Sequence, residues 1–262
     1  MPKTRERSLR VEAVVLRHSD WGEADRLIWL FTKESGKLRA IAKGVRKPRS
    51  RKAGHLEPFT HVRLLLAAGR DMHIITQAEA QEPFLALRED LIRVGYAAYV
   101  IELLDRFTYE EGENAPLFDL LVNTLIRLDS EEEAAFAVRY YEVRLLDLAG
   151  FRPHLFQCVN CGKDIQPEDQ FFSPELGGLL CPACGRVLTG TRFISLPAVR
   201  LLRHLQRSSY AEARRLKLSP AVDWEVEQLM QAYFTYLLER GLNTPSFLRQ
   251  VRRSSSSNND PA

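Results

Sequence analysis

Residues 26–44 read RLIWLFTKESGKLRAIAKG, two short apolar runs separated by the segment ESGK at 34–37. Both runs are shorter than a typical helix and are bounded by turn-forming residues, a pattern that is typical of β-strands. The ESGK segment is a candidate tight turn, in which Gly36 can adopt the unusual φ that residues with side chains avoid. The stretch therefore predicts two strands joined by a short turn.

Three further segments of the first 80 residues have the same character. They read LRVEAVVLR (9–17), HVRLLLAAG (61–69) and HIITQAEA (73–80). Five short strand candidates punctuated by Gly, Pro, Asp and Ser predict a small barrel or sandwich. A five-stranded, partly open barrel is of the OB type, and an SH3-like barrel fits the strand count almost equally well.

The apolar residues recur at three- and four-residue steps after Pro83, which predicts helices. The helical segments are 92–107, 116–128, 130–150, 195–205 and 221–241. Ser130 is the candidate N-cap of the third, with Glu133 completing a capping box. The apolar face of the last is assigned to Trp224, Leu229, Tyr233, Tyr236 and Leu237. The expected fold class is α+β, an N-terminal five-stranded OB-type β-barrel followed by an all-helical domain.

Composition and charge narrow the class of protein. Hydrophobic residues make up 45% of the 262 residues, and no apolar run approaches the ~20 residues of a membrane span. The basic N-terminus is not followed by an apolar segment, so we expect no secretory signal, no membrane partner and a cytoplasmic location. The net charge of +3 hides segregation: residues 1–78 hold 17 Lys and Arg against 8 acidic residues, whereas residues 79–150 hold 6 against 16. This pattern indicates either a polyanion-binding part or neighbouring segments that neutralise each other.

All four cysteines lie in two CxxC pairs, CVNC at 158–161 and CPAC at 181–184, each followed by glycine. Their separation matches a zinc ribbon or knuckle, in which two tight turns bring four thiolates onto one tetrahedral Zn²⁺. Disulfides would require export, of which the sequence shows no sign. A thioredoxin-like redox pair would require a βαβ setting, which is not visible. A catalytic zinc would need an open coordination position, whereas four thiolates close the shell. We therefore expect one structural zinc ion bound by Cys158, Cys161, Cys181 and Cys184.

The sequence carries no recognisable catalytic motif. The P-loop order is absent, GxSxG and HExxH are absent, and the six histidines show no helical ligand spacing. These observations favour a binding protein over an enzyme, with no catalytic residue and no small-molecule substrate.

The densest basic segment starts inside the opening stretch. Residues 37–52, KLRAIAKGVRKPRSRK, hold eight basic residues and no acidic one. Alternation along a strand puts the first three basic side chains on one face and Leu38, Ala40 and Ala42 on the other. The basic loop that follows is expected to be mobile until it closes over a phosphate backbone, with non-specific, salt-dependent binding. The predicted DNA contacts are Lys37, Arg39, Lys43, Arg46, Lys47, Arg49, Arg51 and Lys52, with Trp21 as a stacking partner or a core residue.

Several segments, taken in order, resemble the RecO family of bacterial DNA repair proteins. They are WGEADRLIWLFTKESGKLRAIAKGVRKPRSR, then HLEPF, then IITQAE, then a helical part, then CVNCG and GGLLCPACG. The resemblance covers roughly residues 8–245. The most specific pieces are GKLRAIAKGVRKPRSR followed by LEPF, and the CxxC pairs after DLAGFRPHL.

The resemblance implies a recombination mediator of the RecF pathway. Such a protein binds single- and double-stranded DNA, anneals complementary strands and, with RecR, helps load RecA onto DNA covered by the single-stranded-DNA-binding protein. Association with the nucleoid during repair follows from this role. The resemblance does not place the pocket for the acidic tail of the single-stranded-DNA-binding protein. Candidate contacts to that tail are Arg139, Arg144, Arg200 and Arg203.

Together, these observations predict a domain order and leave two competing functions. The OB-fold DNA-binding domain covers residues 1–80, the helical domain 81–150 and 193–245, the zinc-binding module 151–192, and a flexible tail 246–262. One alternative function is an interaction scaffold, in which the acidic helices and the zinc module recruit proteins and DNA contact is secondary. The other is a nuclease or other zinc enzyme, which would show metal-dependent turnover.

Overall fold

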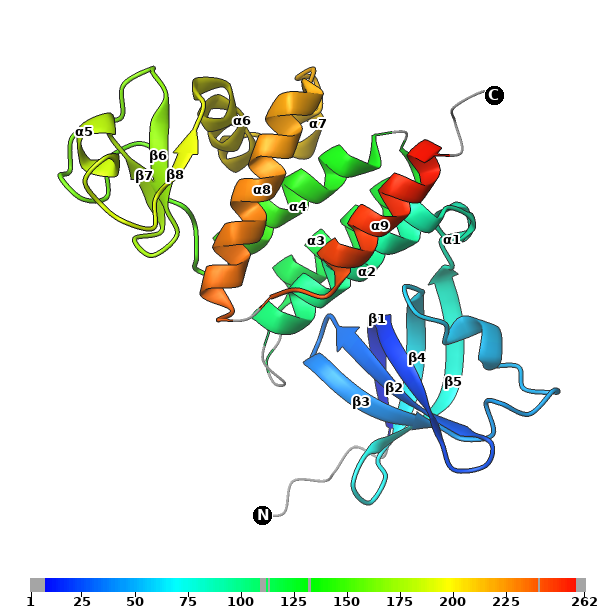
Figure 1. Cartoon of the computed structure of the whole chain (residues 1–262). Helices are drawn as coiled ribbons and strands as arrows, with labels where there is room; N and C mark the ends of the chain where they lie inside the picture. Colours follow the sequence, from blue (N-terminus) through cyan, green and yellow to red (C-terminus); the bar gives the residue numbers. More distant parts are fainter. Residues whose placement is uncertain (1–7, 109–111, 113, 132, 240, 258–262) are drawn as a thin grey trace, which may run out of the picture. The chain divides into compact units, whose positions relative to one another are not determined.

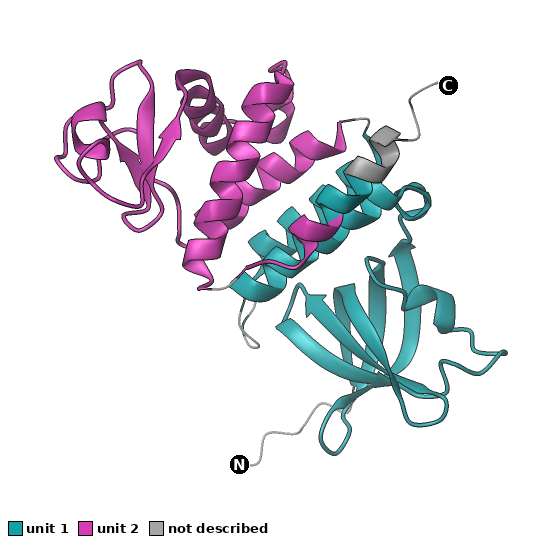
Figure 2. Cartoon of the chain, viewed as in Figure 1, with its two compact units in different colours: residues 1–132, 248–262 teal, residues 133–247 magenta. Residues whose placement is uncertain are grey.

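The computed structural model describes residues 8–108, 112, 114–131, 133–239 and 241–257. The chain divides into two compact units (Figure 2). Unit 1 comprises residues 1–132 and 248–262, and unit 2 comprises residues 133–247. Each unit has its own buried apolar core, and each is described separately below.

Five strands form a closed barrel in unit 1 (Figure 1): β1 Ser8–Trp21, β2 Asp25–Thr32, β3 Gly36–Ala42, β4 His61–Ala67 and β5 His73–Glu82. Their order around the barrel is β1-β2-β3-β5-β4, with β4 pairing back to β1. Neighbouring strands are antiparallel except β3 and β5, which pair in parallel over a short stretch. This closed five-stranded barrel confirms the OB-type prediction, and the SH3-like alternative is wrong.

The barrel core follows from strand alternation in the opening stretch. Ile28 and Leu30 of β2 and Ala40 and Ala42 of β3 are fully buried inside the barrel, while Leu38 packs against this core. The turn between the strands depends on Gly36, which has φ +67 and no room for a side chain. A Cβ at Gly36 would lie 2.5 Å from the carbonyl oxygen of Gly112. Apolar alternation and one glycine therefore explain how this hairpin forms.

Four α-helices belong wholly or largely to unit 1: α1 Leu85–Glu89, α2 Leu91–Phe107, α3 Ala115–Ser130 and α9 Thr244–Ser257. Asp90 caps α2 by accepting from the backbone of Ile92 and Arg93, and Asn114 caps α3. On the outside of the barrel, the Phe31 ring of β2 stacks on Phe118 of α3 at a centroid distance of 6.4 Å.

The predicted flexible tail from residue 246 is wrong for the part that the structure describes. Helix α9 continues through this region, with Leu248 and Val251 buried. Arg252 donates to the hydroxyl of Tyr96 at 2.7 Å. The two apolar residues and the arginine share one helix face. The serine-rich composition of the segment does not indicate this face and therefore predicted a flexible tail. Residues 258–262 lie outside the described part.

Unit 2 contains helices packed beside a small three-stranded sheet of order β7-β6-β8. Its elements are α4 Ala134–Leu148, β6 Gln170–Ser173, β7 Gly178–Leu180, α5 Pro182–Gly185, β8 Arg192–Ile194, α6 Leu196–Arg207, α7 Tyr210–Ala213 and α8 Pro220–Leu237. The prediction that Ser130 caps α4 is wrong, because Ser130 ends α3 and Glu133 occupies the cap of α4. Trp224 and Tyr236 are 64% and 49% exposed and do not belong to the buried face of α8, whereas Leu229 and Tyr233 do.

A buried ion cluster connects α4 to α8. Arg139 is 2% exposed and forms ion pairs with Glu142, with Asp223 at 3.4 Å and with Glu227 at 3.4 Å. Removing charges from water is costly unless they are paired, so this arginine has a structural role. It is therefore not available as a surface contact for an acidic peptide, contrary to the sequence-based assignment.

Within the described part of the chain, none of the helices combines the length and the apolar character needed to cross a lipid bilayer.

Candidate nucleic-acid interface and metal centre

The predicted strip begins on β3, where Lys37 and Arg39 alternate with the inward-facing residues. Lys37 is not a free surface cation. Its Nζ lies 2.9 Å from the Asp105 carboxylate of α2 and also donates to the Asp105 carbonyl oxygen. Arg39 is exposed and stands opposite Trp29 in the β2–β3 register. Lys43 is exposed and lies immediately after the strand.

The basic loop is a succession of turns with fixed ends. At its start, the Gly44 N–H donates to the Asp25 carboxylate at 2.7 Å, and Val45 is buried in the barrel core. Within it, the Ser50 N–H donates to the Lys47 carbonyl at 2.9 Å. At its end, a 3₁₀ turn, Ala53–His55, leads to Leu56, which is again in the core. The cations of this loop are therefore held between two core anchors, Val45 and Leu56.

The LEPF segment, residues 56–59, follows the basic loop and fixes the end of the loop to the barrel. Glu57 accepts from Arg26 at 2.9 Å and contacts His18 at 3.3 Å. Burial opposes ionisation of Glu57, but its hydrogen bonds to Arg26 and His18 outweigh burial and lower the pKa of the carboxyl. Phe59 has φ +74, and its N–H donates to the Val15 carbonyl at 2.8 Å. The motif thus fastens the end of the basic loop to β1 and β2.

The structure separates the predicted cations into paired and unpaired groups. Arg46 lies 3.2 Å from the Asp20 carboxylate. Lys52 donates to the Ile75 carbonyl at 2.9 Å, and burial lowers the pKa of its amine. Among the described residues, no carboxylate lies within ion-pairing distance of the remaining loop cations or of Lys43, all of which are exposed. We call these four the loop cations: Lys43, Lys47, Arg49 and Arg51.

Sequence reasoning missed one aromatic residue of this surface. Trp29 of β2 is half-buried, and the Arg17 guanidinium lies over its ring, 3.7 Å from the centroid. With Arg39 opposite in register, three neighbouring strands form a row Arg17–Trp29–Arg39. The row borders a cavity of about 590 Å³ that Lys37 and His73 also line. Alternation was the available signal, because Ile28 and Leu30 point inward and so Trp29 must point outward.

Trp21, the predicted stacking partner, ends β1 at the hairpin tip. Its side chain is 47% exposed, so it is not a core residue. Its exposed ring stays a predicted contact for DNA.

The four cysteines converge at one point of unit 2. The Sγ atoms of Cys158, Cys161, Cys181 and Cys184 all lie within 4.8 Å of one another, so they could hold a metal ion. Gly162 has φ +74, and its N–H donates to the Cys158 carbonyl at 2.9 Å, closing the first turn. The equivalent bond in the second turn runs from the Gly185 N–H to the Cys181 carbonyl at 2.9 Å.

The electrostatics of the cluster fit a cation. Burial opposes ionisation of Cys158, but backbone N–H groups of Cys161, Cys181 and Asn160 donate to its sulfur and lower the pKa of Cys158 to about 6. For Cys184, the Asn160 amide favours the thiolate, but hydrogen bonds with the neighbouring thiols raise the pKa of Cys184 to about 11. Four thiolates this close repel one another, and a central divalent cation removes that conflict.

Two family models match the chain. "Recombination protein O N terminal" matches residues 7–84, and "Recombination protein O C terminal" matches residues 88–245. The chain belongs to the RecO family. The first match covers the barrel with its basic loop, and the second covers the cysteine cluster.

Relatives in the RecO family align over nearly the whole chain. A protein from Roseiflexus sp. (strain RS-1), named DNA repair protein RecO, is 44% identical over 95% of this chain and 88% of its own length. Proteins of the same name from Dehalococcoides mccartyi and Symbiobacterium thermophilum are each 35% identical, over 90% and 92% of this chain and 93% and 97% of their own lengths. The RecO resemblance found from the sequence is confirmed, and with it a role in DNA repair.

Proposed function

We propose that this RecO-family chain is a non-catalytic recombination mediator that binds single- and double-stranded DNA and anneals complementary strands. The observation that carries the proposal is the group of four loop cations, which have no ion pair among the described residues, together with the Arg17–Trp29–Arg39 row of the same barrel. Unpaired guanidinium and ammonium groups bind phosphates and release counterions, which gives affinity without sequence preference.

The Trp29 row adds a contact of a different kind. An indole or a guanidinium plane beside a cationic groove is the surface on which bases of a single strand stack. Arg39 can bind a phosphate while its neighbour Trp29 takes a base, because paired residues on adjacent strands lie about 5 Å apart. The predicted contacts Lys37, Arg46 and Lys52 contribute less directly, since each already has an acceptor within the protein.

Annealing requires no bond to be made or broken. Two complementary strands repel each other, and a cationic surface that holds one strand lowers this repulsion for the other. The absence of a catalytic motif in the sequence agrees with such a role. We therefore propose that the chain is not an enzyme and takes no small-molecule substrate.

The cysteine cluster is proposed to hold one structural Zn²⁺. Four sulfur ligands close the coordination shell, so the ion would stabilise the module instead of activating water. The module has few buried apolar residues of its own, among them Ile165, Phe172 and Leu179. A bound ion would compensate for this small core.

The proposed partners are DNA, RecR and the acidic tail of the single-stranded-DNA-binding protein, and the proposed outcome is loading of RecA. The proposed location is the bacterial cytoplasm, with nucleoid association during repair. No residues are assigned to the protein partners.

Photo-crosslinking tests the proposed surface. A single strand carrying iodouracil is irradiated with the full-length protein in excess, and crosslinked peptides are identified by mass spectrometry. We expect the crosslinks to fall within residues 17–52, with Trp29 and the loop represented. Crosslinks confined to residues 133–247 would remove the barrel from the DNA path and refute the proposed surface.

A further inference from the structure

Helix α6 in unit 2 has a polar face that carries three arginines and one histidine. Its sequence, LPAVRLLRHLQR, contains Arg200, Arg203, His204 and Arg207 and no acidic residue. The opposite face is buried in the core of unit 2. Like charges three and four residues apart on a helix are destabilising unless something neutralises them.

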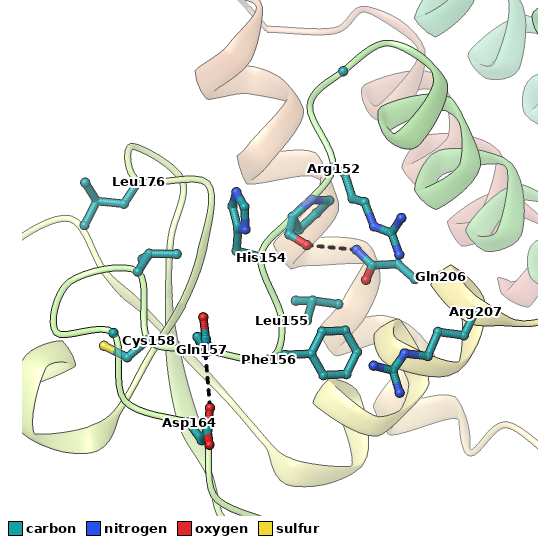
Figure 3. A pocket seen from close by; sticks show the side chains of 14 residues that line it. Arg152, His154, Leu155, Phe156, Gln157, Cys158, Asp164, Leu176, Gln206 and Arg207 are labelled. Carbon is teal, nitrogen blue, oxygen red and sulfur yellow. Dashed lines mark hydrogen bonds between the residues drawn. The ribbon is translucent and has the colours of Figure 1, made fainter.

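Two of these cations share one aromatic ring. The Arg203 guanidinium lies 4.8 Å and the Arg207 guanidinium 3.8 Å from the centroid of Phe156. Figure 3 shows Arg207 extended toward that ring. Arg203 Nε also donates to the Leu155 carbonyl at 2.8 Å, which fixes the orientation of its guanidinium. Burial, and then the charge of Arg207, lower the pKa of Arg203.

Neither arginine has an anionic partner. Across the described part of the chain, no carboxylate comes within ion-pairing distance of Arg203 or Arg207. Arg152, nearby on the same wall, shares the single carboxylate of Asp147 with Arg144, at 3.4 and 3.2 Å. Asp164 also lines this side and accepts from Gln157 at 3.3 Å. Arg144, Arg152, Arg203 and Arg207 still outnumber the carboxylates of Asp147 and Asp164.

Arg207, Arg152 and Phe156 line a cavity of about 910 Å³ (Figure 3). Arg203 lies at its border, over the same Phe156 ring as Arg207. Gln206 lines the cavity and is only 4% exposed. Its Nε2 donates to the Pro153 carbonyl at 2.9 Å, while its Oε1 has no hydrogen-bond partner. A buried acceptor without a partner is uncommon and calls for a donor from a ligand or water. The cavity thus offers cations, an aromatic ring and one unused acceptor.

We infer that this α6 cavity is a second binding site for a single strand of DNA, held through its phosphates by Arg203 and Arg207. Guanidinium groups bind phosphate oxygens through two parallel N–H bonds, and stacking on Phe156 keeps their planes oriented for this. Arg200, Arg203 and Arg207 extend over about 10 Å of helix, so their charges form a row. A row of cations matches a backbone with a charge on every nucleotide better than it matches a single terminal carboxylate.

The inference rests on the proposed function only for the identity of the ligand as DNA. It adds that one chain has two strand sites, the loop cations in unit 1 and the α6 cavity in unit 2. A protein that holds two strands at once raises their local concentration and neutralises both, which promotes pairing.

The test uses three variants of the full-length protein. The α6 variant is Arg203→Gln with Arg207→Gln, and the loop variant is Lys47→Gln with Arg49→Gln and Arg51→Gln. The matched control is Arg186→Gln with Arg192→Gln, two exposed arginines of unit 2 outside the cavity. Metal content and thermal unfolding confirm that each variant is folded.

Native mass spectrometry counts short, non-complementary strands per chain, and fluorescence anisotropy gives each affinity. We expect the wild type and the control to bind two strands per chain. The α6 variant should keep the first and bind the second about 25-fold more weakly at ~0.1 M salt, because each phosphate contact contributes ~0.7 to the salt slope.

Other results would overturn the inference. An α6 variant that still binds two strands as the control does would remove DNA from this cavity, as would a wild type that binds only one. If a fluorescent poly-glutamate peptide bound through Arg203 and Arg207 and DNA did not displace it, the ligand would be an acidic peptide. A loop variant with unchanged first-strand affinity would instead refute the proposed function, whatever the α6 variant does.

Discussion

The division of the predicted cations into unpaired and paired groups can be tested directly. The loop variant replaces Lys47, Arg49 and Arg51, which are exposed and have no ion pair among the described residues. The comparison variant replaces Lys37 and Lys52, whose amines already bind Asp105 and the Ile75 carbonyl. Both variants remove lysine or arginine charge from the same 16-residue segment, so they differ mainly in the availability of the cations.

The expected magnitudes follow from counterion release. Each phosphate contact to a single strand contributes ~0.7 to the slope of log K against log salt. Losing three contacts should reduce that slope by about 2.1 and lower the affinity about 100-fold at ~0.1 M salt. The comparison variant should lose about threefold or less in affinity for DNA, because the amines of Lys37 and Lys52 already bind acceptors within the protein. It should instead lose stability, by about 1 kcal/mol for the carbonyl that Lys52 leaves without a donor.

Fluorescence anisotropy with a labelled single strand, over a series of NaCl concentrations, measures both quantities. Urea unfolding of each variant separates weak binding from loss of fold. Two results would refute the reasoning. One is a comparison variant that weakens binding as much as the loop variant, and the other is a loop variant whose salt slope equals that of the wild type.

Four further changes test other parts of the protein. Trp29→Ala should weaken single-strand binding by about 1–3 kcal/mol with little change in salt slope, and Trp29→Phe should recover most of it; equal losses would mean a packing defect. Cys158→Ser should release the metal, measured as about one zinc per wild-type chain by elemental analysis, and loosen unit 2; full zinc retention would contradict the site. Glu57 has a lowered pKa, so its stabilising effect is present at neutral pH and lost as pH falls through the acidic range; urea midpoints should show a steeper acid dependence for wild type than for Glu57→Gln. Arg139→Met should destabilise the chain by about 3–5 kcal/mol by leaving three acidic side chains without their cation, and an unchanged unfolding midpoint would refute the cluster's role.

The barrel and the cysteine cluster could be predicted because their signals are local. Alternation around Ile28, Leu30, Ala40 and Ala42 is a two-residue period, and it sets both the strands and their inner face. The CxxC spacing is equally local, since each turn positions two sulfurs without help from the rest of the chain. Such features need only neighbouring residues, so a single sequence reveals them.

What sequence reasoning missed depends on long-range partners. Lys37 pairs with Asp105, which lies 68 positions further along the chain, and no pattern within the basic strip indicates this pairing. Arg139 looks like a surface charge on α4 until Asp223 and Glu227 of α8 surround it. The α9 helix was missed for a related reason. Burial of Leu248 and Val251 stabilises this helix, and the composition of the segment does not reveal that these two residues are buried.

Strand pairing tests the proposed function most directly. Two complementary labelled strands are mixed with and without the full-length protein, and the pairing rate is followed by energy transfer at increasing NaCl, without nucleotide cofactor. We expect the wild type to accelerate pairing, the acceleration to fall with salt in parallel with DNA binding, and the loop variant to lose it. Strands that pair no faster with the wild-type protein than without it would contradict a role in annealing.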